Sequence, residues 1–506
     1  MSGATSSTTA DSTTVTGATT TATTTTTSSN ASTSSTGMAD PCDVLAGATV
    51  GSGCGIFVQS GSNGTGTQSN PFGSIAQALA IATVAKVPVY VCQGTFDEAL
   101  QLEEGVTLYG GLDCANGWKW VAAPNATERT LVAPAAGVPL VVNHSATASS
   151  AGRVFGFTFH AAAGASPGDS SIAAIVQSAP VQFEQTRFEA SAGHDGLDGV
   201  QSAPAATKGP TGNDGVGSFM SNCSTTLPGH AGGASKANPS CPSSIGGPGG
   251  AGGDSAGGNA DYGTEGSPAG TGGPGGEGAK CIGSNPVICM LCKAGQKGTD
   301  GPDGPRGSAG VGLGTFTTTF AGVNGGAGSA GTPGAGGGGG GGARNTTGNC
   351  VGGDGGGGGG PGGCGGAGGP GGTFGGSSIA IVVVGTAAVS FVQCTAASQQ
   401  AGRGGDGAPG LPGAAGGSGG FGGDHSAAAF IQTDGCFGGP GGTGGDGGHG
   451  GGGSGGHSVG LLCVNTLCDA TGITFDPVMQ SFAGAGGVGD GMNDGAAGQA
   501  VETLTL

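Results

Sequence analysis

Residues 171–188 read SIAAIVQSAPVQFEQTRF, and two later stretches repeat this pattern. SIAIV at residues 378–382, followed by VSFVQCT at residues 389–395, matches it in order and spacing, and SVGLL at residues 458–462 begins a third copy. No copy is long enough to enclose a hydrophobic core, and its apolar residues alternate, as Val181 and Phe183 do. Strands this short are stable only when copies stack on one another. The pattern therefore predicts neighbouring strands of one repetitive all-β structure.

A helix and further short strands are expected nearer the N-terminus. Ser74 is suited to cap a helix in which Ile75, Leu79 and Ala82 share one face. Short β-rich segments follow at residues 87–92, 99–102 and 106–109.

This N-terminal region also carries a family resemblance. The stretches NPFGSIAQAL (70–79), VYVCQGTF (89–96) and GVTLYGG (105–111) resemble the capping helix and first coils of pectin-lyase-like right-handed parallel β-helices, in particular those of large exported bacterial proteins. The resemblance covers about residues 55–192. It implies a right-handed parallel β-helix, or solenoid, with a short N-terminal capping helix. It does not choose an activity, because such proteins range from polysaccharide lyases to adhesins.

The sequence divides into alternating structured and glycine-rich parts, in which consecutive strand layers are separated by long excursions. The expected divisions are a disordered Ser/Thr-rich stalk (1–38), a strand and capping helix (39–86), β-helix coils (87–192), a Gly-rich insertion (193–374), one further coil (375–400), a second Gly-rich insertion (401–456), and a terminal coil with the C-terminal segment (457–506).

Composition excludes an ordinary globular protein, since the 506 residues include 125 glycines and only 9% are charged. The formal net charge of −18 disfavours nucleic acid and anionic lipid as partners. No apolar run is long enough to form a transmembrane segment, and residues 1–37 contain no apolar core of a signal peptide. We expect an export signal upstream of Met1, and we expect the stalk to hold a folded part away from an envelope.

Fifteen cysteines indicate an oxidising compartment. Their spacing suggests disulfides that close short loops, pairing Cys42 with Cys54, Cys92 with Cys114, Cys223 with Cys241, Cys350 with Cys364, and Cys463 with Cys468. The odd count leaves at least one thiol unpaired, from among Cys281, Cys289, Cys292, Cys394 and Cys436. The CxxC at residues 289–292 has no second metal-ligand pair, so a structural disulfide is expected there.

The Gly-rich insertions leave three alternatives open. Glycine recurs at every third position from Gly295 to Gly310, which is the collagen spacing. The same spacing suits polyproline II (PPII) strands packed side by side, because the missing side chains let backbones approach. A disordered loop is the third alternative.

Aspartates accompany these glycines, and Asp195 and Asp198 are weak candidates for Ca²⁺ ligands. The segment around them partly resembles one repeat of a calcium-binding β-roll, with His194 replacing a glycine. A single repeat does not form a roll, so solvated aspartates in turns are the favoured interpretation. No other metal or cofactor is expected.

Catalytic constellations are sparse. A polysaccharide lyase or glycosidase needs converging carboxylates. Glu184, Arg187 and Glu189 lie on one coil, where Glu184 and Arg187 are expected to be outward and solvated. The histidines lie apart, without metal-binding spacing. Trp118 and Trp120 are expected to pack on the first coils, with stacking on a sugar as the alternative.

We therefore expect an exported cell-surface or extracellular structural or adhesive β-solenoid protein without catalysis, with glycans or envelope components as partners. The first alternative is a polysaccharide-degrading β-helix enzyme, and the second is a repetitive PPII-like Gly-rich binding surface. Convergence of Glu184 and Glu189 with a further acid along a groove would favour the enzyme.

Overall fold

The computed structural model describes residues 42, 44, 49–103, 105–120, 129–143, 151–217, 227–282, 288–344, 352–385, 388–424, 434–476 and 479–506. The chain forms two units, Met1–Asp40 and Pro41–Leu506, and every described residue belongs to the second. The predicted stalk lies outside the described residues, as do Cys223, Cys350 and His425.

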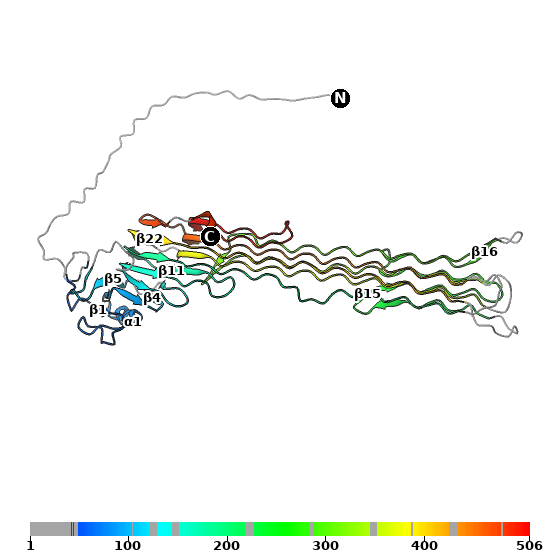
Figure 1. The fold of residues 1–506 in the computed structure, drawn as a ribbon, viewed down its shortest axis with the longest axis horizontal. Helices are drawn as coiled ribbons and strands as arrows, with labels where there is room; N and C mark the ends of the chain where they lie inside the picture. The colour runs from blue at the N-terminus through cyan, green and yellow to red at the C-terminus, as the bar shows by residue number, and fades with distance from the viewer. Residues whose placement is uncertain are drawn as a thin grey trace, which may run out of the picture. The chain divides into compact units, whose positions relative to one another are not determined.

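Three sheets of parallel strands make up one part of the fold (Figure 1). Sheet 1 contains β1 (Ile56–Val58), β2 (Val89–Cys92), β5 (Thr107–Asp113), β9 (Gly152–Phe155), β12 (Val181–Glu184) and β21 (Val389–Val392), with β6 (Lys119–Trp120) antiparallel to β5. Sheet 2 contains β3 (Gly94–Phe96), β7 (Thr130–Val132), β10 (Phe157–His160), β13 (Arg187–Glu189), β22 (Cys394–Ala397) and β24 (Ile473–Phe475). Sheet 3 contains β4 (Leu100–Glu103), β8 (Leu140–Asn143), β11 (Ser171–Gln177), β20 (Ser378–Val384), β23 (Ser458–Val464) and β25 (Ala500–Thr505).

The chain visits the three sheets in a fixed order. From β2 it passes to β3 in sheet 2 and β4 in sheet 3, returns to sheet 1 at β5, and repeats the circuit with β9, β10 and β11. Each long excursion leaves sheet 2 and re-enters sheet 3. The excursions comprise residues 190–377 between β13 and β20, residues 398–457 between β22 and β23, and residues 476–499 between β24 and β25. Because they all begin and end between the same two sheets, the excursions lie side by side.

The repeated segments pair as the sequence predicts. Ser171 of β11 is paired with Ser378 of β20, which is paired in turn with Ser458 of β23. In sheet 1, Val181 of β12 is paired with Val389 of β21. The prediction that these copies are neighbouring strands of one structure is confirmed, as is the all-β class with parallel sheets.

The main hydrophobic core lies between the sheets and includes side chains from strands of all three, and the side chains on the other face of sheet 3 form a second hydrophobic cluster. Aromatic side chains stack from one strand to the next, as shown by Phe183 and Phe391, whose ring centroids are 5.8 Å apart. Phe159 and Phe188 stack in the same way at 5.9 Å. Each layer therefore depends on its neighbours for burial.

Helix α1 (Ile75–Ala85) lies on this core, as predicted, with Ile75 and Leu79 buried. Ser74 Oγ accepts a hydrogen bond from the amide of Gln77 at 3.2 Å. The carboxylate of Glu98 adds a second cap, because it accepts bonds from the amides of Ile75 at 2.7 Å and Ala76 at 3.1 Å. The helix ends at Lys86, whose φ is 55°. The short 3-10 helix η3 (Gln480–Phe482) opens the last excursion.

The excursions form a bundle of extended runs that lie side by side (Figure 1). The runs comprise residues 193–217, 227–238, 241–254, 258–268, 272–282, 288–311, 322–344, 352–376, 400–424 and 434–457, followed by a C-terminal hairpin at 484–498. Short antiparallel pairs join consecutive runs: β14 (Lys236–Asn238) with β15 (Cys241–Gly246), β16 (Lys280–Ile282) with β17 (Ile288–Met290), and β18 (Thr315–Phe316) with β19 (Phe320–Ala321).

The runs have a period of three residues. In run 322–344, a Cβ added at Gly336 would collide with the carbonyl of Ile245, at Gly337 with that of Gly439, and at Gly338 with that of Pro274. Gly339 faces the first neighbouring run again, at Pro248. Three directions in three residues is the geometry of PPII and of polyglycine strands. The described parts of the insertions are therefore packed PPII-like runs, and the disordered-loop alternative is wrong for them.

The proportion of glycine in a run increases with the number of runs that surround it. Run 288–311, which has glycine at every third position, turns those glycines toward the bundle. Run 322–344 is continuous glycine from Gly336 to Gly342, where other runs surround it. The sequence thus encodes which runs are internal, because a side chain fits only where no neighbouring backbone lies.

Disulfides occur in both parts of the fold, in the part that contains the sheets and within the bundle. Cys42–Cys54, Cys92–Cys114 and Cys463–Cys468 are bonded as predicted. The pairings Cys223–Cys241 and Cys350–Cys364 are wrong, because Cys241 is bonded to Cys364 across neighbouring runs. The CxxC cysteines are both in structural disulfides, although with other partners, namely Cys281–Cys289 and Cys292–Cys436.

Such a set of disulfides indicates a non-reducing environment. The residues that the structure describes include no membrane-spanning helix.

Candidate functional site

Asp195 and Asp198, the weak candidates for calcium ligands, lie in an extended run and not in the turns that the sequence analysis favoured. Asp195 Oδ1 accepts a hydrogen bond from the amide of Arg403 at 2.6 Å, and Asp198 Oδ1 accepts one from the amide of Asp406 at 2.7 Å. The glycine that follows each aspartate donates to the carbonyl of the same partner, Gly196 to Arg403 at 2.8 Å and Gly199 to Asp406 at 2.7 Å. We call this arrangement the Asp-Gly clasp.

The clasp recurs along the edges of the bundle. Its further members are Asp214-Gly215 on Phe421, Asp300-Gly301 on Thr443, Asp303-Gly304 on Asp446, and Asp406-Gly407 on Val488. In every case one carboxylate oxygen is bound to a backbone amide of the neighbouring run. Within the described residues, no group of three or more His, Cys, Asp or Glu side chains is placed to hold a metal ion. These aspartates therefore have a structural role, because their carboxylates bind neighbouring runs together, and their sequence did not predict it.

The tryptophans and histidines occupy different settings. Trp118 is buried against Phe57 at a centroid distance of 4.8 Å, and Trp120 packs on Phe155 at 5.2 Å, so the packing interpretation is confirmed. His457 is buried, and burial lowers its pKa. His160 joins a cluster of charged residues on sheets 1 and 2.

This charged cluster contains the acids considered for catalysis. Arg153 forms an ion pair with Glu184 at 2.5 Å. The guanidinium of Arg187 binds both Glu189 and Asp476, the latter at 2.7 Å. Glu184 and Arg187 lie on the outward face of their strands, as expected, but they are not freely solvated, because their side chains are only 15% and 26% exposed.

The electrostatics of the cluster favour ion pairing. Burial opposes ionisation of Glu189, but hydrogen bonds from Arg187 and His160 outweigh it and hold its pKa below the ordinary value. Burial also lowers the pKa of Arg129, with a further contribution from Arg187. The Cys394 thiol is free and buried, and its burial raises its pKa. A carboxylic acid that acts as a general acid needs a raised pKa, and a nucleophilic thiol needs a lowered pKa. The pKa of Glu189 is lowered and that of Cys394 is raised, so neither group is tuned for catalysis.

A groove of about 530 Å³ lies on the bundle, next to the tip of the C-terminal hairpin. Residues that line it include Asp303, Arg306, Pro409, Asp446, His449 and Asp490. They come from run 288–311, run 400–424, run 434–457 and the hairpin tip.

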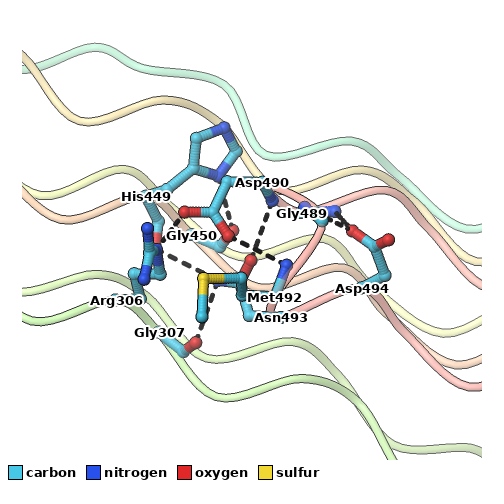
Figure 2. A network of polar contacts seen from close by, with 10 residues as sticks. Arg306, Gly307, His449, Gly450, Gly489, Asp490, Met492, Asn493 and Asp494 are labelled. Atoms are coloured by element: carbon cyan, nitrogen blue, oxygen red, sulfur yellow. Dashed lines mark hydrogen bonds and ion pairs between the residues drawn. The ribbon is translucent and has the colours of Figure 1, made fainter.

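Figure 2 shows the polar contacts of the hairpin tip, which contributes Asp490 to the lining of the groove. Asn493 Nδ2 donates to the carbonyl of Gly307 at 3.0 Å, and Asp490 is ion-paired with Arg306. His449 Nδ1 lies 2.8 Å from the carbonyl oxygen of Gly450, which accepts a hydrogen bond from it. Asn493 Nδ2 also lies 3.4 Å from the carbonyl oxygen of His449, so the tip is anchored to two runs.

The outward positions of run 434–457 change where the hairpin ends. Under the hairpin they are glycines, Gly452 and Gly455, whose amides donate to the carbonyls of Asn493 and Ala496. Beyond the tip they carry side chains, in the order His449, Asp446, Thr443, Pro440 and Phe437. The sequence contains this signal, since every third residue changes from glycine at 452 and 455 to a residue with a side chain, but only the structure shows that the hairpin ends there.

No family model, no curated protein and no solved structure matches this chain.

Proposed function

We propose that the protein is an exported structural and adhesive scaffold of the cell surface or extracellular space, without catalysis. In this proposal, the three sheets are the faces of a right-handed parallel β-helix of the kind that the resemblance to pectin-lyase-like proteins implies. The divisions expected from the sequence are its parts, with the glycine-rich insertions forming the displayed bundle.

The observation that carries the proposal is the common origin of the excursions. Every excursion leaves sheet 2 and returns at sheet 3, so repetitive layers serve as the base for one ordered bundle. Cys241–Cys364 and Cys292–Cys436 connect runs that are 123 and 144 residues apart in sequence. Much of the chain thus forms an extended bundle that disulfides cross-link, and a rigid extended bundle is suited to display and binding. The bundle also supports the narrower idea that the repetitive Gly-rich surface is where binding takes place.

The charged cluster argues against the polysaccharide-degrading alternative. Glu189 and Asp476 share one guanidinium, and Glu184 is held by Arg153. An inverting or retaining glycosidase needs one carboxyl kept protonated as the acid, whereas the pKa of Glu189 is lowered. The cluster therefore stabilises the sheets by paired charges.

The disulfides support an oxidising location, which we propose to be extracellular. Glycans or envelope components are the proposed partners, and the charge of −18 disfavours nucleic acid.

The test compares turnover with binding. The full chain and the variants Glu189→Gln and Asp476→Asn would be incubated with uronic-acid and neutral polysaccharides, with and without Ca²⁺, while new reducing ends and unsaturated products are measured. The scaffold proposal expects no product from any of the three proteins, together with retention on immobilised glycans or isolated envelopes. Product release by the unmodified chain that is lost in Glu189→Gln would establish the enzyme instead.

A further inference from the structure

The first arm of the C-terminal hairpin shows how the bundle accepts an added strand. Gly484 and Gly487 donate to the carbonyls of Gly456 at 3.0 Å and Gly453 at 2.8 Å in run 434–457. The carbonyls of Ala485 and Val488 accept from Gly404 and Gly407 in run 400–424, both at 2.8 Å. One strand thus pairs with two runs by a rule that repeats every three residues.

Glycine is required in this strand at each donor position. A Cβ at Gly484 would collide with the carbonyl of Gly402, and one at Gly487 with that of Gly405. The residue that follows each of these glycines carries a side chain, Ala485 or Val488, whereas Gly486 faces the second arm of the hairpin at the carbonyl of Gly495. A strand that follows the rule must therefore have the sequence (Gly-X-Y)n.

Beyond the hairpin tip the same two rows of backbone groups continue without a strand. In run 400–424 the next donors are the amides of Gly410, Gly416 and Gly419, which have no acceptor among the residues that the structure describes. Gly413, between them, donates to Asp446 Oδ1 at 2.8 Å.

The opposite row continues too. In run 434–457 the next carbonyl, that of Gly450, is bound by His449 Nδ1 at 2.8 Å. Beyond it the acceptors are the carbonyls of Gly447, Gly444 and Gly441, and no described residue donates to them. The groove beside Pro409 and Asp446 is the beginning of this track.

We infer that this track, formed by residues 410–419 and 441–447, binds an extended (Gly-X-Y)n strand of another polypeptide. The strand runs parallel to run 400–424, donates from its glycines to the open carbonyls, and accepts at its X residues from the open amides. At a rise of about 3.1 Å per residue, the nine steps from Gly410 to Gly419 correspond to about 28 Å of PPII strand. The inference does not depend on the proposed scaffold function, because it rests on the backbone rows alone.

The charges select the partner. Asp303, Asp446 and Asp490 line the groove, against the single cation Arg306 among the groove residues named above. A strand with basic Y residues gains from these carboxylates. A second copy of this chain is disfavoured, because each copy carries −18 and its own glycine runs are already packed. The occupant is therefore a neutral or basic glycine-repeat strand from a different protein.

The test uses a fluorescent (Gly-Ala-Lys)3 peptide and the full chain, with fluorescence anisotropy as the readout. The control peptide (Ala-Ala-Lys)3 has the same charge and length, but methyl groups where glycine is required. We expect at least tenfold weaker binding of the control, with the difference retained in 0.5 M NaCl. Equal binding of both peptides, or loss of all binding in salt, would overturn the inference.

Two variants locate the site. Pro412→Trp places a large side chain over the track and is expected to weaken binding at least tenfold, whereas Val200→Trp, at a site 75% exposed on run 193–217, leaves it unchanged. Asp446→Ala frees the amide of Gly413 and is expected to tighten binding of a neutral (Gly-Ala-Ala)3 peptide several-fold. Unfolding would not tighten binding, so this variant also controls for misfolding. Unchanged affinity in both groove variants, or chain self-association that Pro412→Trp abolishes, would contradict the assignment.

Discussion

The carboxylate of Asp303 accepts a hydrogen bond of 2.8 Å from the amide of Asp446, a residue 143 positions further along the chain. Asp300 makes the same contact with the amide of Thr443 at 2.7 Å. Under the hairpin, the corresponding amides of Gly452 and Gly455 donate to carbonyls of another run. Aspartate side chains thus replace a neighbouring run where the bundle has an edge, much as charged residues protect the edge strands of sheets.

Acid should weaken these edges. Hydrogen bonds from Lys297 and from the Thr443 amide lower the pKa of Asp300 in the folded protein. A depressed folded pKa means that its stabilisation is present above the unfolded pKa and is lost as pH falls through the folded pKa. We expect the melting temperature to fall as pH drops below the ordinary aspartate range, and Asp300→Asn to reduce that dependence. Identical pH profiles of melting temperature for the two proteins would contradict this role.

Internal glycines should tolerate no side chain. Gly338→Ala places a methyl group against the carbonyl of Pro274, whereas a Cβ at Gly53 has no atom within 4 Å. We expect Gly338→Ala to lower the free energy of unfolding by about 1–3 kcal/mol through overpacking, and Gly53→Ala to have little effect. Denaturant unfolding of both variants measures the difference. Equal stabilities would mean that run 322–344 is not packed.

The long-range disulfides should contribute most to stability. Chain entropy predicts a contribution of about 5 kcal/mol for Cys241–Cys364, at a separation of 123 residues, and about 2 kcal/mol for Cys463–Cys468, at a separation of 5. The double variants Cys241→Ser/Cys364→Ser and Cys463→Ser/Cys468→Ser would be compared by thermal unfolding. A larger loss from the second pair would show that the bundle does not depend on its cross-links.

The thiol of Cys394 should be inert in the native state. It is 1% exposed in the core, and burial raises its pKa, so little thiolate is present near pH 8. We expect an alkylating reagent to leave the peptide that contains Cys394 unmodified until denaturant is added, as judged by mass spectrometry. Rapid native labelling of that peptide would contradict the burial of β22.

The stacked strands were predictable because they follow local rules. Alternation around Phe183 and its recurrence at Phe391 specify both the strands and their pairing, since a shift of one residue would turn both rings to the wrong face. Ser74 likewise predicts the start of α1 through its cap.

The bundle was harder to predict because its contacts are distant in sequence. Short-loop spacing gives Cys42–Cys54 correctly and fails for Cys241, whose partner Cys364 lies on another run. The Asp-Gly clasp was also missed, because an aspartate before glycine is equally typical of a turn. The number of glycines in each three-residue repeat was the sequence feature that could have predicted the packing. A run of continuous glycine, such as Gly336–Gly342, is surrounded by other runs, whereas runs at the edge of the bundle carry side chains.

Hydrogen–deuterium exchange on the full chain tests the central claim most directly. Amides of Gly337 and Gly340 are bound to Gly360 and Gly357 at 2.8 Å inside the bundle, whereas those of Gly410 and Gly416 are open at its edge. The account predicts protection at Gly337 and Gly340 comparable to that of strand β20, with fast exchange at Gly410 and Gly416. Exchange of Gly337 and Gly340 at the rate of an unstructured peptide would contradict an ordered glycine bundle built on stacked sheets.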